Sequence, residues 1–115
     1  MTLHEILIEG ICAFEVFRQL GFPSEDIYFA AHTDDVPPTV SLAVKRGGKM
    51  FTLALGPRPK GIDDKEIEKE WTTLANDYNA GKWDPGFHDI FYGSRARSQA
   101  VNIIMALTAK GMYPP

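Results

Sequence analysis

Apolar and polar positions alternate from Val40 to Leu55, a pattern typical of two β-strands that bury one face. Gly47 and Gly48 divide the segment, and a Gly-Gly pair is a favoured hairpin loop because both positions accept positive φ. Closing the loop there predicts the pairs Val44–Phe51, Leu42–Leu53 and Val40–Leu55 on one face, and Ala43–Thr52 and Ser41–Ala54 on the other. The first face is apolar throughout, so we expect it to cover a core on one side of the sheet.

Helical spacing of apolar residues predicts three helices around this hairpin. Capping and stop residues mark their ends: Thr2 and Gly21 for the first helix, Asp63 and Gly81 for the second, Ser94 and Gly111 for the third. A short β-prone run from Ile27 to His32 adds a strand before the hairpin. The order α-β-β-β-α-α therefore predicts an α+β fold, a three-stranded antiparallel meander packed on helices on one face.

Composition fits this picture and limits the partners. The chain has 115 residues, of which 44% are hydrophobic and 23% are charged, so we expect a single domain over residues 1–115. Its first five elements follow the order of double-stranded-RNA-binding domains. Those domains need lysines where the second helix begins, whereas this helix opens with Asp63, Asp64 and Glu66. Together with the net charge of −3, this predicts no nucleic-acid partner.

The N-terminal segment and the cysteine content predict a compartment. Glu5, Glu9 and Glu15 interrupt the first apolar stretch, which is therefore expected to be neither a signal peptide nor a membrane span. Cys12 is the single cysteine, so no intramolecular disulfide can form and a reducing environment is favoured. We expect a soluble, cytoplasmic protein with no membrane partner.

Catalytic and metal-binding patterns are weak. His4, His32 and His88 share no metal-ligand spacing, so no metal site and no cofactor are predicted. Cys12 lies within the first predicted helix without a local base, where a cysteine is more often a packing residue than a nucleophile. No catalytic residue is assigned, and an enzyme is the less favoured interpretation.

The segment from Trp83 to Arg97 is the candidate binding region. Its aromatic residues fold back to cap the core or else form the wall of a pocket, two alternatives that the sequence leaves open. The helix start at Ser94 can hold an anion through its free N–H groups and two arginines. The candidate ligand-binding residues are Trp83, Phe87, His88, Tyr92, Ser94, Arg95 and Arg97.

The first helix carries more apolar surface than one core requires. Ile8, Cys12 and Val16 form a separate row beside its main apolar arc, and either the last helix or a second chain covers that row. Met50 lies on the outer face of the hairpin. Ile8, Cys12, Val16 and Met50 are therefore the candidate interface of a homodimer.

The favoured hypothesis is a non-catalytic module that binds a protein partner or self-associates. The alternative is a small-molecule or anion-binding protein, or an enzyme, that uses residues 82–97. A pocket holding His88, Arg95 and Arg97 would favour the alternative, whereas an apolar surface patch would favour the module.

Overall fold

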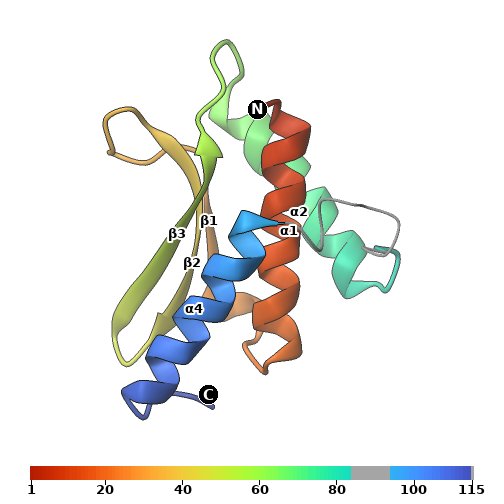
Figure 1. The fold of residues 1–115 in the computed structure, drawn as a ribbon. Coiled ribbons are helices and arrows are strands. Elements are labelled where there is room, and N and C mark those ends of the chain that lie inside the picture. The colour runs from red at the N-terminus through yellow and green to blue at the C-terminus, as the bar shows by residue number, and fades with distance from the viewer. Residues whose placement is uncertain (84–93, 115) are drawn as a thin grey trace.

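Three helices and one antiparallel sheet make up the fold, which is given by a computed structural model that describes residues 1–83 and 94–114. The elements are α1 (Leu3–Gln19), a 3-10 turn η1 (Ser24–Asp26), β1 (Ile27–Ala30), β2 (Thr39–Arg46), β3 (Lys49–Pro57), α2 (Asp64–Asn79) and α4 (Arg95–Ala109). The helices lie on one side of the sheet (Figure 1). The predicted α+β meander is confirmed.

The predicted register of the hairpin is confirmed over most of its length and is wrong at the end far from the loop. The strand order is β1-β2-β3, and the observed pairs include Val44–Phe51, Leu42–Leu53, Ala43–Thr52 and Ser41–Ala54. Val40 pairs with Gly56, because a β-bulge between Val40 and Ser41 shifts the register by one residue. The bulge leaves Leu55 in the core. A side chain at Gly56 would lie 2.9 Å from Ile6, so this glycine lets α1 approach the sheet closely.

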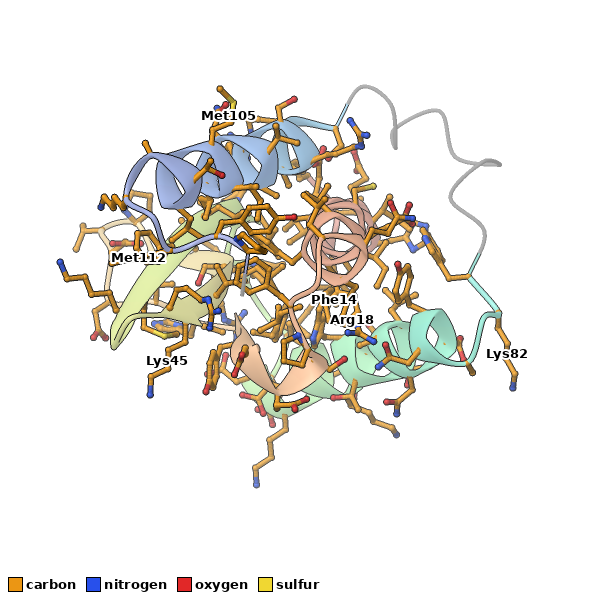
Figure 2. The ribbon with its side chains drawn as sticks, turned by 90° about the horizontal axis from the view of Figure 1, so that it is seen from below. Phe14, Arg18, Lys45, Lys82, Met105 and Met112 are labelled. Atoms are coloured by element: carbon orange, nitrogen blue, oxygen red, sulfur yellow. The ribbon has the colours of Figure 1, made fainter. Side chains whose placement is uncertain are left out.

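Helix α1 is the centre of the molecule. Every residue from Ile6 to Phe17 is buried, including Glu9 and Glu15. Figure 2 shows α1 between α4 and α2, with the sheet alongside. A helix enclosed in this way needs apolar residues all round, which explains the extra row predicted on α1.

Aromatic contacts join α2 to both α1 and the sheet. The Trp71 ring stacks on Phe29 of β1 with centroids 4.8 Å apart, and it meets the Phe14 ring of α1 edge-on at 5.6 Å. Gly10 of α1 makes room for this ring, because a Cβ atom there would lie 2.8 Å from Trp71 Cζ3. The core therefore lies between the apolar face of the sheet and the helices.

The predicted helix starts are confirmed by their caps. Thr2 and Glu5 form the reciprocal capping box of α1. The Asp63 side chain accepts a hydrogen bond from the Lys65 N–H at 3.2 Å, and Ser94 Oγ accepts one from the Arg97 N–H at 3.0 Å. None of the helices in residues 1–83 and 94–114 has the length and apolar character needed to cross a membrane.

Candidate functional site

The start of α4 already holds an anionic group from the same chain. Glu9 of α1 is buried, and its Oε2 accepts hydrogen bonds from Ser94 Oγ at 2.5 Å and from the Ala96 N–H at 3.0 Å. A carboxylate at a helix N-terminus satisfies free N–H groups and is favoured by the helix dipole. The position predicted for an external anion is therefore occupied by Glu9, and Ser94 has a structural role.

Glu9 is the polar residue that sequence reasoning missed. A carboxylate between Ile8 and Cys12 on a buried helix surface requires a hydrogen-bonding partner, and this signal was present in the sequence. The sequence did not show which residue is the partner, because Ser94 lies 85 residues away.

The two arginines of the predicted anion site serve different positions. Arg95 is exposed, and its Nη2 donates to the carbonyl oxygen of Leu55 on β3 at 3.4 Å. Arg97 is partly buried, and its backbone N–H donates to the capping hydroxyl of Ser94. Arg95 therefore serves the contact between α4 and β3.

The aromatic loop is described only at its first residue. Trp83 is partly buried and packs against Ile8 and Cys12 of α1, which agrees with the core-capping alternative at this position. Phe87, His88 and Tyr92 lie outside the described residues, so their assignment to a binding site stays a prediction.

Three of the four candidate interface residues are buried by their own chain. Ile8 is 3% exposed, Cys12 0% and Val16 7%, so no second chain is needed to cover this row. Cover from within the chain describes the structure, because α4 packs on α1 and Trp83 packs on Ile8 and Cys12. Met50 is 50% exposed on the outer sheet face and is the member of the set that a partner can contact.

The described groups offer little for nucleophilic or metal chemistry. Burial, reinforced by the neighbouring Glu9 carboxylate, raises the pKa of the Cys12 thiol to about 12, so the reactive thiolate is disfavoured at neutral pH. In residues 1–83 and 94–114, no three side chains of His, Cys, Asp or Glu come together as a metal site would require. Both His4 and His32 are exposed.

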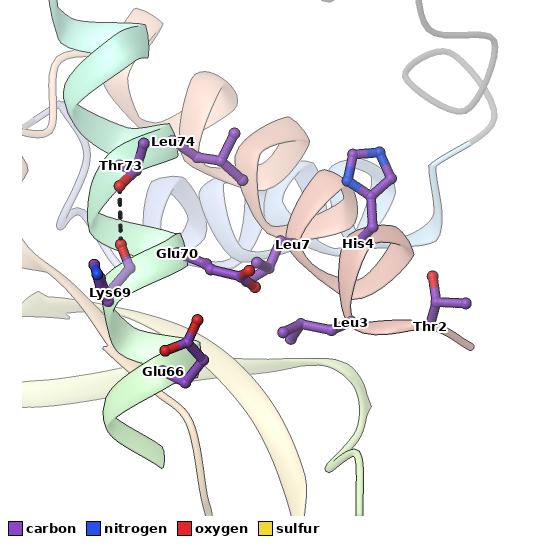
Figure 3. Close-up of a pocket in the computed structure, with 9 residues that line it drawn as sticks. All are labelled: Thr2, Leu3, His4, Leu7, Glu66, Lys69, Glu70, Thr73 and Leu74. Atoms are coloured by element: carbon purple, nitrogen blue, oxygen red, sulfur yellow. Dashed lines mark hydrogen bonds between the residues drawn. The ribbon is translucent and has the colours of Figure 1, made fainter. Parts of the chain in front are cut away.

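A groove between α1 and α2 has a volume of about 660 Å³. Leu3, Leu7 and Leu74 supply its apolar surface, and Figure 3 shows these side chains projecting between the two helices. Glu66 and Glu70 line the same space from α2. Its other lining residues are Thr2, His4, Lys69 and Thr73.

Glu66 and Glu70 belong to a more extended acidic surface. The helix start from Asp63 to Glu70 contains five acidic residues and two lysines. The groove therefore combines an apolar interior with a negative rim, a pattern that suits a partner with apolar and basic side chains. The sequence predicted a helix with an acidic start, but it did not show that the leucines of α1 lie beside that helix.

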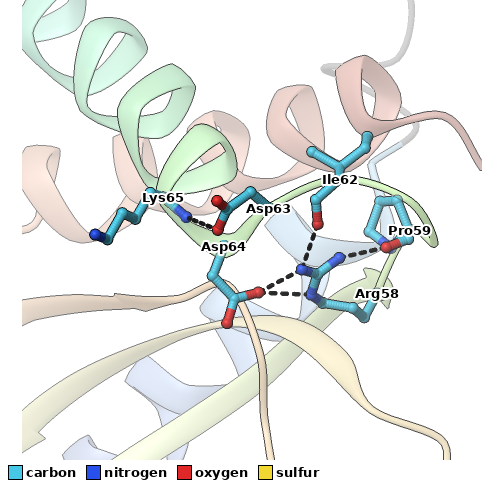
Figure 4. Close-up of polar contacts among 6 residues, drawn as sticks. All are labelled: Arg58, Pro59, Ile62, Asp63, Asp64 and Lys65. Carbon is cyan, nitrogen blue, oxygen red and sulfur yellow. Dashed lines mark hydrogen bonds and ion pairs between the residues drawn. The ribbon is translucent and has the colours of Figure 1, made fainter.

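Arg58 fastens the connection between β3 and α2 and is not a free binding group. Its guanidinium donates to Asp64, to the Pro59 carbonyl and, at 2.6 Å, to the Ile62 carbonyl (Figure 4). Arg58 Nε lies 2.9 Å from Asp64 Oδ1. These bonds hold the start of α2, and with it the acidic rim of the groove, in a fixed place relative to the sheet.

Comparison of the chain with protein-family models, with curated proteins and with solved structures gave no match.

Proposed function

We propose that this protein is a non-catalytic interaction module that binds a basic amphipathic helix of a partner protein in the groove between α1 and α2. The observation that carries the proposal is the apolar interior of that groove beside the acidic start of α2. An amphipathic helix lays its apolar stripe in such a groove, and the charges on its flanks select the orientation and the partner.

The polar groups of the described chain support a binding role over a catalytic one. Glu9 and Ser94 are engaged with each other and with α4, and Arg58 is engaged with Asp64. Cys12 is held as a neutral thiol. In contrast, Glu66 and Glu70 are exposed and line the groove, where a partner can reach them.

The test uses an 18-residue helical peptide with a leucine stripe and lysines on its flanks, followed by fluorescence anisotropy. We expect it to bind and to shift the amide resonances of Leu3, His4 and Leu74. Replacing both Glu66 and Glu70 by lysine should weaken binding by about tenfold or more, since each reversal turns an attraction into a repulsion.

Glu68→Lys is the matched control, because Glu68 is an exposed acid of the same helix that does not line the groove. It should leave the affinity within about twofold of the wild type. Equal loss in the control and the double variant, or resonance shifts confined to other surfaces, would contradict the proposal.

Self-association remains the second form of this interaction hypothesis, now limited to the outer face of the sheet. Met50 is exposed there on β3. Sedimentation equilibrium at micromolar concentration distinguishes a dimer from the 12.8 kDa chain, and Met50→Glu should dissociate a dimer formed through this face. We place the module in the cytoplasm, on the argument that its single cysteine is free and buried.

A further inference from the structure

The edge of β3 is a second candidate binding surface, because it carries backbone groups that can form further hydrogen bonds. β3 is an edge strand of the sheet and pairs with β2 on one side. In a hairpin with a two-residue loop, the residues that flank the loop, Arg46 and Lys49, exchange backbone hydrogen bonds. Hydrogen-bonded and non-hydrogen-bonded pairs then alternate along the strands, so the backbone N–H and C=O groups of Met50, Thr52 and Ala54 point away from β2. Within residues 1–83 and 94–114, no further backbone hydrogen bond reaches these three residues.

A groove runs beside this edge. Thr52, Leu53 and Ala54 line a cavity of about 260 Å³ together with Gln99, Asn102 and Ile103 of α4. Gln99 Oε1 is buried and has no hydrogen-bond partner in the described chain. An orphan acceptor of this kind is unfavourable, and a donor that entered the groove would satisfy it after a turn of the side-chain amide.

A cationic side chain lies near each end of the stretch of β3 that lines the groove. Arg95 donates to the carbonyl oxygen of Leu55, and Lys110 Nζ lies 5.2 Å from the centre of the Phe51 ring. Phe51 and Leu55 are four positions apart on β3, a distance of about 13 Å along an extended chain. Neither β3 nor α4 contains an acidic residue. The surface is therefore opposite in charge to the groove between α1 and α2.

We propose that the β3–α4 groove binds an extended segment of a partner protein that adds a fourth strand to the sheet. The segment carries two acidic residues four positions apart, which face Arg95 and Lys110, with an apolar residue between them over Leu53 and Ile103. Strand addition supplies the affinity through backbone bonds, and the alternate side chains supply the specificity.

Charge favours this occupant over a second copy of the chain. In an antiparallel pair of β3 strands centred on Thr52, Lys49 of one copy lies opposite Leu55 of the other, where Arg95 is already bound. Like charges then meet at both ends, and the strand brings no acid to compensate. Lys49 and Pro57 also bound the free edge, which suits a short peptide.

The probe is the capped pentapeptide glutamate-threonine-valine-threonine-glutamate. Paired antiparallel to β3, its threonine N–H groups point to the edge strand and its valine N–H points away. We expect N-methylation of both threonines to weaken binding by about tenfold or more, and N-methylation of the valine to leave it nearly unchanged. A lysine peptide with the same central residues should not bind.

Variants of the protein test the same contacts. Arg95→Glu and Lys110→Glu should each reduce affinity for the acidic peptide about tenfold, whereas Lys65→Glu, a charge reversal on exposed α2, should not.

Three outcomes would overturn the proposal. The first is the absence of resonance shifts in the β3 amides at millimolar peptide, and the second is equal binding of the acidic and basic peptides. The third is a concentration-dependent dimer that Thr52→Pro dissociates and Thr52→Ala does not, since this would assign the edge to a second copy. Proline is tolerated at an outward-facing edge position, and a thermal melt confirms that each variant is folded.

Discussion

Replacement of Glu9 by glutamine tests whether the buried carboxylate holds α4 on α1. Glutamine keeps the size of the side chain and one carbonyl acceptor, but it removes the negative charge that faces Ser94 Oγ and the Ala96 N–H. Hydrogen bonds to charged groups are each stronger by about 1 kcal/mol than neutral ones. Loss of the favourable helix-dipole interaction adds about 0.3–1 kcal/mol.

The lower desolvation cost of a neutral amide offsets part of this loss. We therefore expect Glu9→Gln to lower the free energy of unfolding by about 2 kcal/mol, measured by urea denaturation followed by circular dichroism. Glu68→Gln, at an exposed position, is the control and should stay within about 0.5 kcal/mol of the wild type.

A double-mutant cycle assigns the effect to this contact. Ser94→Ala alone should cost about 1–2 kcal/mol, because it removes both the cap of α4 and a donor to Glu9. In the Glu9→Gln background the cost should fall by about 1 kcal/mol, since part of the interaction is already lost. Strict additivity, or a Glu9→Gln variant as stable as the wild type, would refute this account of the α1–α4 contact.

Three further predictions concern the hairpin, the thiol and metal binding. Leu53→Ala truncates a buried side chain and should cost about 2–5 kcal/mol in urea melts, whereas exposed Thr52→Ala should be nearly neutral; equal costs would contradict the assigned faces. Cys12 should resist alkylation at pH 8 until the protein is unfolded. Because folding raises its pKa from 9.0 to about 12, its contribution to stability is complete below pH 9 and is lost as the pH rises toward 12, which pH-dependent melts measure. Chelator should leave the melting temperature unchanged, and one tightly bound equivalent of zinc or iron would contradict the predicted absence of a metal site.

Local signals in the sequence were sufficient for the elements of the fold. The Gly47-Gly48 loop set the register near the turn, because a two-residue loop leaves one way to pair the residues beside it. Thr2, Asp63 and Ser94 marked the helix starts, because a capping side chain bonds to N–H groups two or three residues away. These interactions join residues that are close together in the sequence, so they do not depend on the tertiary arrangement.

Tertiary structure alone decided which surfaces remain exposed after the helices pack on the sheet. The bulge at Val40 lies opposite Gly56, where α1 approaches the sheet closely, and the Glu9–Ser94 bond joins residues 85 positions apart. Neither leaves a periodic trace in the sequence. The leucines of α1 meet the acids of α2 only after both helices dock, and the basic groove beside β3 exists only because α4 lies along it. Amphipathic patterns show which side of an element is apolar, but which elements share that side depends on how the whole chain excludes water.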